Sequence, residues 1–541
     1  MRPFTLFLVA LSIFVQPLVA GDEPIPAFTI MVPMRDGTEL PTDIYLPDMQ
    51  AKGLPCILLR STAGRKAFPW REYAHLTKLG YCVAIQDTRS AIDPEGKTIP
   101  FWADGWGVER DGYDAVEWLA SSIYTNGKIG TIGFSQSGIT QQMMAPTAPP
   151  SLKCQYIGVA PGSLYHYAVF NGGQFLKAQV ESWMGYYARD PSHLSYMRNQ
   201  PYYNAFWDAF DAIKRADQVC VPAMHYSGWY DIFVQGTIDN FTQLQEHGGD
   251  GARGKQKLVI GPWTHFWPST MKLGDFEVPA NAQQMPMEYL PQNWFAYYLK
   301  GEENNIDDLP SVMYYTMGPL DGSPSKGNVW HSAASWPPPS TQTAFYLTKD
   351  MTLTTDKQST ESEIFVYDYD PNDHVPTRGG RNLFIESGPM DQQEIESRSD
   401  VYAFTSQPLN QDTEVTGRLH AKLFISSTHA DTDVIIRLCD VYPDGRSILI
   451  SDAAVRTGTL KKNNTPQQVI PLNFDLWSTS LVFAKGHRIR LSVSSSNYPR
   501  YEKNHNLGIL TKHNEPADVA TNAIHVGGTH ASHLMLPIVE R

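Results

Sequence analysis

The sequence has few cysteines, no clustered metal ligands and no glycine-rich phosphate loop. Only 5 of its 541 residues are cysteine, at wide spacings, which excludes a disulfide framework and a cysteine-bound zinc site. None of the 16 histidines stands in a known ligand spacing, so we predict no metal. No phosphate-binding loop follows the first buried strand pattern, and we therefore predict no nucleotide cofactor.

Positive charge is also sparse. The chain has 43 Lys and Arg against 56 Asp and Glu, a net charge of −13 and no basic run, which argues against a duplex nucleic-acid partner. With 42% hydrophobic residues the chain is folded rather than disordered. This balance favours a small, neutral or apolar molecule as the partner.

The first twenty residues have the order of a secretory signal peptide. Arg2 supplies a positive charge, residues 4–15 are almost continuously apolar, and Ala20 stands before Gly21. Because the apolar stretch is shorter than a membrane span of about 20 residues, we expect cleavage after residue 20, no stable membrane insertion, and a secreted or periplasmic protein. An uncleaved anchor is the alternative, since Leu18 is not the small residue preferred two positions before the cut.

Short apolar runs alternate with helical stretches in residues 21–320. The runs are flanked by Gly or Pro, as is typical of strands buried on both faces of a sheet. They cover residues 57–60, 82–86, 128–133, 156–160, 221–225 and 257–260. The alternation predicts a doubly wound, mostly parallel α/β sheet.

Two further units follow from the sequence pattern. Residues 162–219 separate two of these strands and are rich in aromatic side chains, so we expect a helical cap over the edge where α/β sheets bind ligands. A helical subdomain that only buries its own rings is the alternative. In residues 321–541 strand and helix patterns no longer alternate. Short segments of alternating apolar and polar residues there predict an antiparallel β-sandwich.

A serine framed by glycines ends one of the strand patterns. The segment Gly133-Phe134-Ser135-Gln136-Ser137-Gly138 leads from a buried run into a helical pattern. A sharp strand-to-helix turn of this kind lifts the serine hydroxyl above the sheet, and small neighbours are needed because larger side chains would clash. We predict that Ser135 is a nucleophile.

A serine nucleophile needs a general base and an acid that orients the base, and in this fold they follow in the order Ser, Asp, His. The next two strand ends read Gly-Trp-Tyr-Asp231 and Gly-Pro-Trp-Thr-His265. We therefore assign His265 as the general base and Asp231 as the residue that fixes its tautomer. The alternatives are His225, inside an apolar run, and Asp239, deeper in the following helix.

With these motifs the sequence resembles the cocaine-esterase-like hydrolases, the CocE/NonD group related to Xaa-Pro dipeptidyl-peptidases and α-amino-acid ester hydrolases. Further matching segments are residues 34–37, 80–89, 431–433, 440–445 and 486–490, so the resemblance spans nearly all of the chain after residue 20. It implies an α/β-hydrolase domain with a helical cap insertion, followed by an all-β jelly-roll sandwich domain. It also places the family's catalytic triad on Ser135, Asp231 and His265.

One loop departs from the family pattern. The family usually has Arg-x-Pro-Tyr, whose tyrosine hydroxyl helps bind the oxyanion, whereas residues 60–64 read Arg-Ser-Thr-Ala-Gly, with Ala63 in the tyrosine position. The backbone N–H of Gln136 can still donate, and the second donor must be the Thr62 hydroxyl or a backbone N–H of this loop. An unreplaced donor would cost about 2.7 to 4 kcal/mol of transition-state stabilisation.

The same loop bears on the substrate. Amino-acid ester hydrolases of the family place an acidic residue after that tyrosine to hold an ammonium group, and Gly64 carries no charge. We therefore predict a secreted, cofactor-free serine hydrolase that forms an acyl-enzyme, and we favour an ester with an apolar acyl part. Phe233, Trp229 and Trp263 are the predicted pocket walls, with plain packing as the alternative for the two tryptophans.

Two other functions stay open. An Xaa-Pro dipeptidyl-peptidase, acting on a short peptide, is the alternative within the same class. A catalytically weakened relative whose jelly roll binds carbohydrate or another ligand is the alternative from a different class, and the altered loop at residues 60–64 suggests it. The sequence does not fix the oligomeric state.

Overall fold

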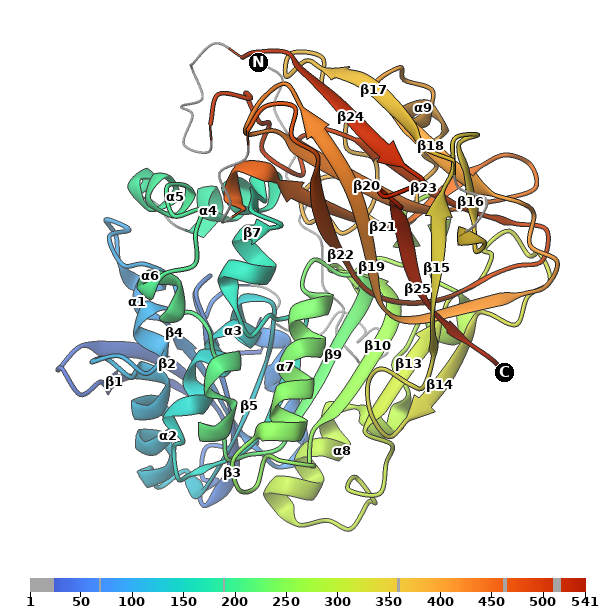
Figure 1. Cartoon of the computed structure of the whole chain (residues 1–541). Helices are drawn as coiled ribbons and strands as arrows, with labels where there is room; N and C mark the ends of the chain where they lie inside the picture. Colours follow the sequence, from blue (N-terminus) through green and yellow to red (C-terminus); the bar gives the residue numbers. More distant parts are fainter. Residues whose placement is uncertain (1–23, 68–69, 188–189, 358–360, 461–464, 509–516) are drawn as a thin grey trace, which may run out of the picture.

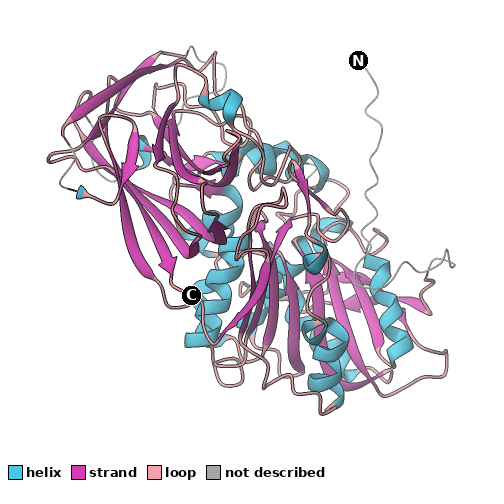
Figure 2. Cartoon of the chain, turned by 90° about the vertical axis from the view of Figure 1, so that its right-hand side faces the viewer, coloured by secondary structure: helices cyan, strands magenta, loops and turns pink. Residues whose placement is uncertain are grey.

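The computed structural model describes residues 24–541, apart from 68–69, 188–189, 358–360, 461–464 and 509–516. The predicted signal peptide therefore lies outside the described residues. In the described part of the chain, no helix is long and apolar enough to cross a membrane. Two β-rich bodies make up the molecule, and helices surround the first of them (Figure 1, Figure 2).

The first body is built on a ten-stranded sheet. In spatial order its strands are β1 (Phe28–Pro33), β2 (Glu39–Tyr45), β4 (Cys82–Asp87), β3 (Leu54–Ser61), β5 (Thr125–Phe134), β6 (Leu152–Gly158), β9 (Ala223–Tyr230), β10 (Lys257–Thr264), β13 (Val312–Thr316) and β14 (Val329–Ala333). Neighbouring strands from β4 to β13 pair parallel, whereas the pairs at the two edges are antiparallel. Every residue of β4, β9 and β10 is buried, which confirms the predicted α/β sheet.

Helices cover this sheet. They are α1 (Arg89–Ile92), α2 (Asp111–Ser121), α3 (Gln136–Met144), α7 (Val234–His247) and α8 (Pro291–Phe295). A 3-10 helical segment (Trp70–Leu79), a π-helical segment (Ala296–Lys300) and a small hairpin of β11 (Lys272–Leu273) and β12 (Phe276–Glu277) accompany them. α3 starts directly after Ser135, and α7 starts shortly after β9 ends. Their N-termini therefore stand at the C-terminal edge of the parallel strands, where such sheets bind ligands.

The chain between β6 and β9 forms the cap. It contains a π-helical turn (Tyr165–Val169), β7 (Phe170–Asn171), β8 (Gln174–Phe175), α4 (Lys177–Tyr187), α5 (Pro191–Arg198), α6 (Ala205–Asp208) and a final turn (Ile213–Gln218). Several of its aromatic rings pack on one another. The ring centroid of Phe170, for example, lies 5.7 Å from that of Phe175 and 6.0 Å from that of Trp207.

The second body is a β domain whose strands pair antiparallel except for β16 with β18, drawn from yellow to red in Figure 1. Its elements are β15 (Thr341–Leu347), β16 (Thr352–Thr354), β17 (Glu363–Tyr369), α9 (Gln393–Glu396), β18 (Tyr402–Ser406), β19 (Thr413–Ser427), β20 (Asp433–Val441), β21 (Ser447–Arg456), β22 (Ile470–Phe483), β23 (Arg488–Ser494), β24 (Ala520–Val526) and β25 (His533–Val539). This confirms the predicted all-β C-terminal domain. The division at residue 320 is wrong, because β14 pairs antiparallel with β13 and extends the first sheet to Ala333.

Buried hydrogen bonds tie the end of β9 to the second body. Arg381, which is 1% exposed, donates from Nε to the carbonyl of Trp229 at 3.1 Å and from NH1 to Ser451 Oγ at 2.9 Å. The hydroxyl of Tyr230 donates to the carbonyl of Leu449 at 3.0 Å. These bonds satisfy polar groups that have no access to water. Each body therefore supplies hydrogen-bond partners that the other needs at their interface.

Replacing Arg381 should therefore destabilise the whole protein. Arg381→Met leaves several buried oxygens without a donor, and we expect the free energy of unfolding, measured by denaturant titration, to fall by about 3 kcal/mol. Arg378→Met is the matched control, because that side chain is 38% exposed and its ion pair with Glu394 is long, at 3.7 Å. The control should change stability by less than about 0.5 kcal/mol. Equal losses in the two variants would contradict the role given to Arg381.

Candidate active site

Ser135 occupies the sharp turn between β5 and α3. Its backbone has φ 53° and ψ −125°, a conformation that residues other than glycine seldom adopt. A Cβ on Gly133 would lie 2.6 Å from the Cβ of Ser137. A Cβ on Gly138 would lie 2.6 Å from the Cβ of Ala160. The two glycines thus leave the room that this turn requires.

The structure brings Asp231 and His265 together with Ser135. Nε2 of His265 lies 3.0 Å from Oγ of Ser135, and its Nδ1 lies 2.5 Å from Oδ1 of Asp231. The other oxygen of Asp231 accepts a hydrogen bond from Ser227 Oγ at 2.6 Å. Because the carboxylate faces Nδ1, it favours the tautomer with a proton there and an unprotonated Nε2 toward the serine.

The two alternative residues lie elsewhere. His225 is fully buried in β9, where its Nε2 lies 3.2 Å from Oε1 of Gln256. Desolvation lowers the pKa of His225 to about 4, so the ring stays neutral in the core. Asp239 lies on α7, where its carboxylate accepts hydrogen bonds from Tyr167 and Gln235.

The loop after β3 packs against the first residue of α3. Thr62, 3% exposed, donates its hydroxyl to Oε1 of Gln136, and the N–H of Ala63 donates to Ser61 Oγ at 3.1 Å. The predicted donors Thr62 hydroxyl and Ala63 N–H are therefore engaged within the protein. Among the described residues, the backbone N–H groups of Thr62 and Gln136 have no acceptor.

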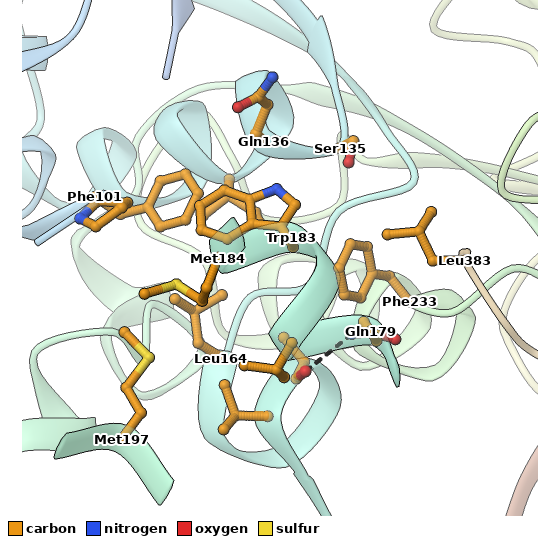
Figure 3. A pocket seen from close by; sticks show the side chains of 15 residues that line it. Phe101, Ser135, Gln136, Leu164, Gln179, Trp183, Met184, Met197, Phe233 and Leu383 are labelled. Carbon is orange, nitrogen blue, oxygen red and sulfur yellow. Dashed lines mark hydrogen bonds between the residues drawn. The ribbon is translucent and has the colours of Figure 1, made fainter. Parts of the chain in front are cut away.

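An apolar cavity of about 70 Å³ opens at Ser135, and Figure 3 shows the side chains around it. Besides Ser135 and Gln136, its lining is Pro100, Phe101, Ile139, Leu164, Ala168, Val169, Gln179, Val180, Trp183, Met184, Met197, Phe233 and Leu383. The rings of Phe101 and Trp183 stack with their centroids 5.6 Å apart. None of these lining side chains carries a charge.

Of the three predicted pocket residues, only Phe233 lines this cavity. Trp229 and Trp263 are each 1% exposed. The ring of Trp263 stacks on Trp267 with centroids 3.6 Å apart, and that of Trp229 packs against Trp336 at 5.5 Å. Both tryptophans therefore fill the core beside the strands that carry Asp231 and His265, and their prediction as pocket walls is wrong.

Several walls of the cavity have no signal in the sequence. Leu383 comes from the segment between β17 and β18 in the second body, and Phe101 from the loop before α2. No local pattern marks either residue, because both reach the cavity only through tertiary packing. Trp183 belongs to the aromatic-rich cap segment that the sequence does flag, although Tyr165, Tyr167 and Phe170 of that segment border a different cavity.

The chain matches two family models. Residues 36–189 and 177–267 match the X-Pro dipeptidyl-peptidase (S15 family), a range that includes Ser135, Asp231 and His265. Residues 304–535 match the X-Pro dipeptidyl-peptidase C-terminal non-catalytic domain. The first match lies within the first body, and the second covers β13 and β14 of the first sheet as well as the second body.

Proteins that are similar over the whole chain point to the same group of hydrolases. Cocaine esterase from Rhodococcus sp. (strain MB1 Bresler) is 30% identical over 95% of this chain and 99% of its own. Two solved structures show the same fold. An α-amino acid ester hydrolase has a TM-score of 0.78 at 22% identity over 100% of both chains. An aminopeptidase from a marine sediment archaeon (Thaumarchaeota archaeon) has a TM-score of 0.80 at 20% identity, covering 97% of this chain and 99% of its own. The chain therefore belongs to the cocaine-esterase-like (CocE/NonD) family and is an α/β-hydrolase enzyme of the serine hydrolase class.

Proposed function

We propose that this enzyme hydrolyses esters with an uncharged, apolar acyl group through an acyl-enzyme on Ser135. The supporting observation is the hydrogen-bond path from Asp231 through His265 to Ser135, which opens into a cavity lined by uncharged side chains. A charged group in that cavity would lose its hydration without gaining a group of opposite charge. An uncharged, apolar acyl group has no charge to desolvate when it enters the cavity, and it gains contact with the apolar side chains there.

Acylation starts at the Ser135 hydroxyl. Nε2 of His265 takes the hydroxyl proton while Oγ attacks the ester carbonyl, and the Asp231 carboxylate stabilises the imidazolium that forms. The Ser227 hydroxyl holds the second oxygen of Asp231 and so fixes the plane of the carboxylate. The imidazolium then protonates the leaving alkoxide. In the second half of the reaction, His265 activates a water molecule that releases the acid from Ser135.

The tetrahedral oxyanion needs donors that are in place before the reaction. We assign this role to the backbone N–H groups of Gln136 and Thr62, which have no other acceptor among the described residues. The family pattern has proline, which lacks an N–H, where this chain has Thr62. Thr62 therefore adds an N–H donor to the loop in which Ala63 replaces the family's tyrosine. Its hydroxyl also holds the loop against α3 by donating to Gln136.

Two other functions have less support. An Xaa-Pro dipeptidyl-peptidase is the second candidate, since both family models carry that description. Such a substrate brings a free ammonium group, and the catalytic cavity has no carboxylate among its lining residues. A catalytically weakened ligand-binding relative is the third. The distances of 3.0 Å and 2.5 Å along the proposed triad argue against it.

A matched pair of substrates tests the acyl preference. Methyl propionate and alanine methyl ester differ only by the α-ammonium group. We expect kcat/KM, measured by pH-stat, to be about 100-fold higher for the propionate, because the ammonium would be buried without a carboxylate to pair with. Ala-Pro-p-nitroanilide should be a poor substrate. If the anilide or the alanine ester is turned over faster than the propionate, the proposed substrate class is wrong.

The role of Ser135 has its own test. A fluorophosphonate probe should label the folded wild-type enzyme at Ser135, and Ser135→Ala should lose both the label and measurable turnover of every ester in the series. Ser121→Ala, at an exposed serine on α2, is the matched control and should still be labelled. Absence of an adduct on wild type would refute Ser135 as the nucleophile.

Two substitutions of Thr62 separate its backbone N–H from its hydroxyl. Thr62→Pro removes the N–H and should lower kcat by about 100- to 1000-fold, the usual cost of one oxyanion donor. Thr62→Val keeps the N–H, loses only the hydroxyl, and should lower kcat by less than about tenfold. Circular dichroism checks that both variants fold. Similar losses in the two variants would show that the N–H is not the donor.

We also propose that residues 1–20 are removed during export, so that the mature enzyme acts outside the cytoplasm. The support is the basic, apolar, small order of that segment. N-terminal sequencing of the exported chain should begin at Gly21. Recovery of an intact chain starting at Met1 from the membrane fraction would favour the anchor instead.

A further inference from the structure

A second cavity, about 300 Å³ in volume, lies where the cap meets the second body. Residues 165–167 and 170–173 of the cap form one side, and Arg418 of β19 with parts of β21 and β22 forms the other. We call this cavity the polar groove. The catalytic cavity borders the same π-helical turn through other residues, Ala168 and Val169, and through Leu164 just before it. The proposed hydrolysis makes no use of the polar groove.

The cap side of the polar groove sits tightly against the second body. Gly172 has φ 55°, and a Cβ on it would lie 1.7 Å from the carbonyl oxygen of Ala454. Gly173 has φ 82°, and its Cβ would lie 2.2 Å from Oγ1 of Thr459. The N–H of Arg456 also donates to the carbonyl of Gly172 at 2.9 Å. Because only glycine fits at these two positions, this wall is fixed before any ligand enters.

The charged groups at the polar groove are paired with one another, one arginine with two carboxylates. NH2 of Arg418 lies 2.5 Å from Oδ2 of Asp475, and NH1 lies 3.3 Å from Oδ2 of Asp239. Asp239 also accepts hydrogen bonds from the Tyr167 hydroxyl at 2.5 Å and from Gln235 Nε2 at 2.7 Å. The arginine is therefore already paired with carboxylates, which disfavours an anionic ligand. Both carboxylates already have donors, which disfavours a cationic one.

The uncharged polar side chains of the polar groove, in contrast, are free to form hydrogen bonds with a ligand. In the part of the chain that the structure describes, the side chains of His166, Asn171 and Asn473 form no hydrogen bond. Desolvation lowers the pKa of His166, so its ring is neutral at pH 7. The rings of Tyr165 and Tyr167 are partly exposed beside these groups.

We propose that the polar groove binds a neutral mono- or disaccharide. Sugar hydroxyls both donate and accept hydrogen bonds, as do the free amides and the neutral imidazole, and the apolar face of a sugar ring can pack on tyrosine. The cavity volume of about 300 Å³ is at the lower end of the range for small-molecule sites, which suits a ligand of this size. The proposal is independent of the ester hydrolysis proposed above.

Saturation-transfer NMR on the full chain tests the proposal directly. The Ser135→Ala variant is used so that no turnover occurs, with glucose, galactose, N-acetylglucosamine, cellobiose and maltose as probes and with acetate and tetramethylammonium as charged controls. At least one sugar should receive saturation, and its dissociation constant is then measured by calorimetry. Transfer to a charged control but to no sugar, or to no probe at all, overturns the proposal.

Variants then locate the sugar. Asn473→Ala and His166→Ala, each made in the Ser135→Ala chain, should weaken binding about tenfold by removing one hydrogen-bonding group. Asn473 is exposed on β22, so its loss should leave the melting temperature unchanged even if His166→Ala fails to fold. Gln342→Ala, an exposed amide on β15 outside the groove, is the matched control and should bind as tightly as the parent. A sugar that binds the Asn473 variant with undiminished affinity lies elsewhere and refutes the assignment.

Discussion

The hydrogen bond from the Arg381 guanidinium to the carbonyl of Trp229 joins the two bodies at the strand end that leads to Asp231. Burial makes this bond necessary, because a carbonyl without water or donor costs about 1 to 3 kcal/mol. Desolvation lowers the pKa of Arg381 to about 10, and the side chain is still charged at neutral pH. The position of Asp231, and through it that of His265, thus depends on a residue that the other body supplies.

The buried strands and the turn at Ser135 could be predicted from the sequence because each depends on residues that are close together in the chain. Strands that are covered on both faces must be apolar throughout, and β4, β9 and β10 are indeed buried at every residue. The turn at Ser135 needs small neighbours, so its glycines are visible in the sequence. The chain order of Asp231 and His265 then follows from the order of the strands in the sheet.

The direction of individual side chains could not be predicted in the same way. Trp229 and Trp263 each stand two positions before a member of the proposed triad, yet both point into the core. Leu383 reaches the catalytic cavity only because the second body docks beside the cap, and no periodicity encodes that contact. The same holds for Thr62, whose hydroxyl is committed to Gln136 by the packing of a loop on a helix.

The partners of β9 arrive late in the order of synthesis. Arg381 follows Trp229 by 152 residues, and Leu449 follows Tyr230 by 219. A ribosome therefore makes the serine turn and the acid well before it makes the groups that hold the acid in place. The nascent first body cannot complete these contacts on its own. Completion of the site therefore waits at least until Leu449 on β21 has been made.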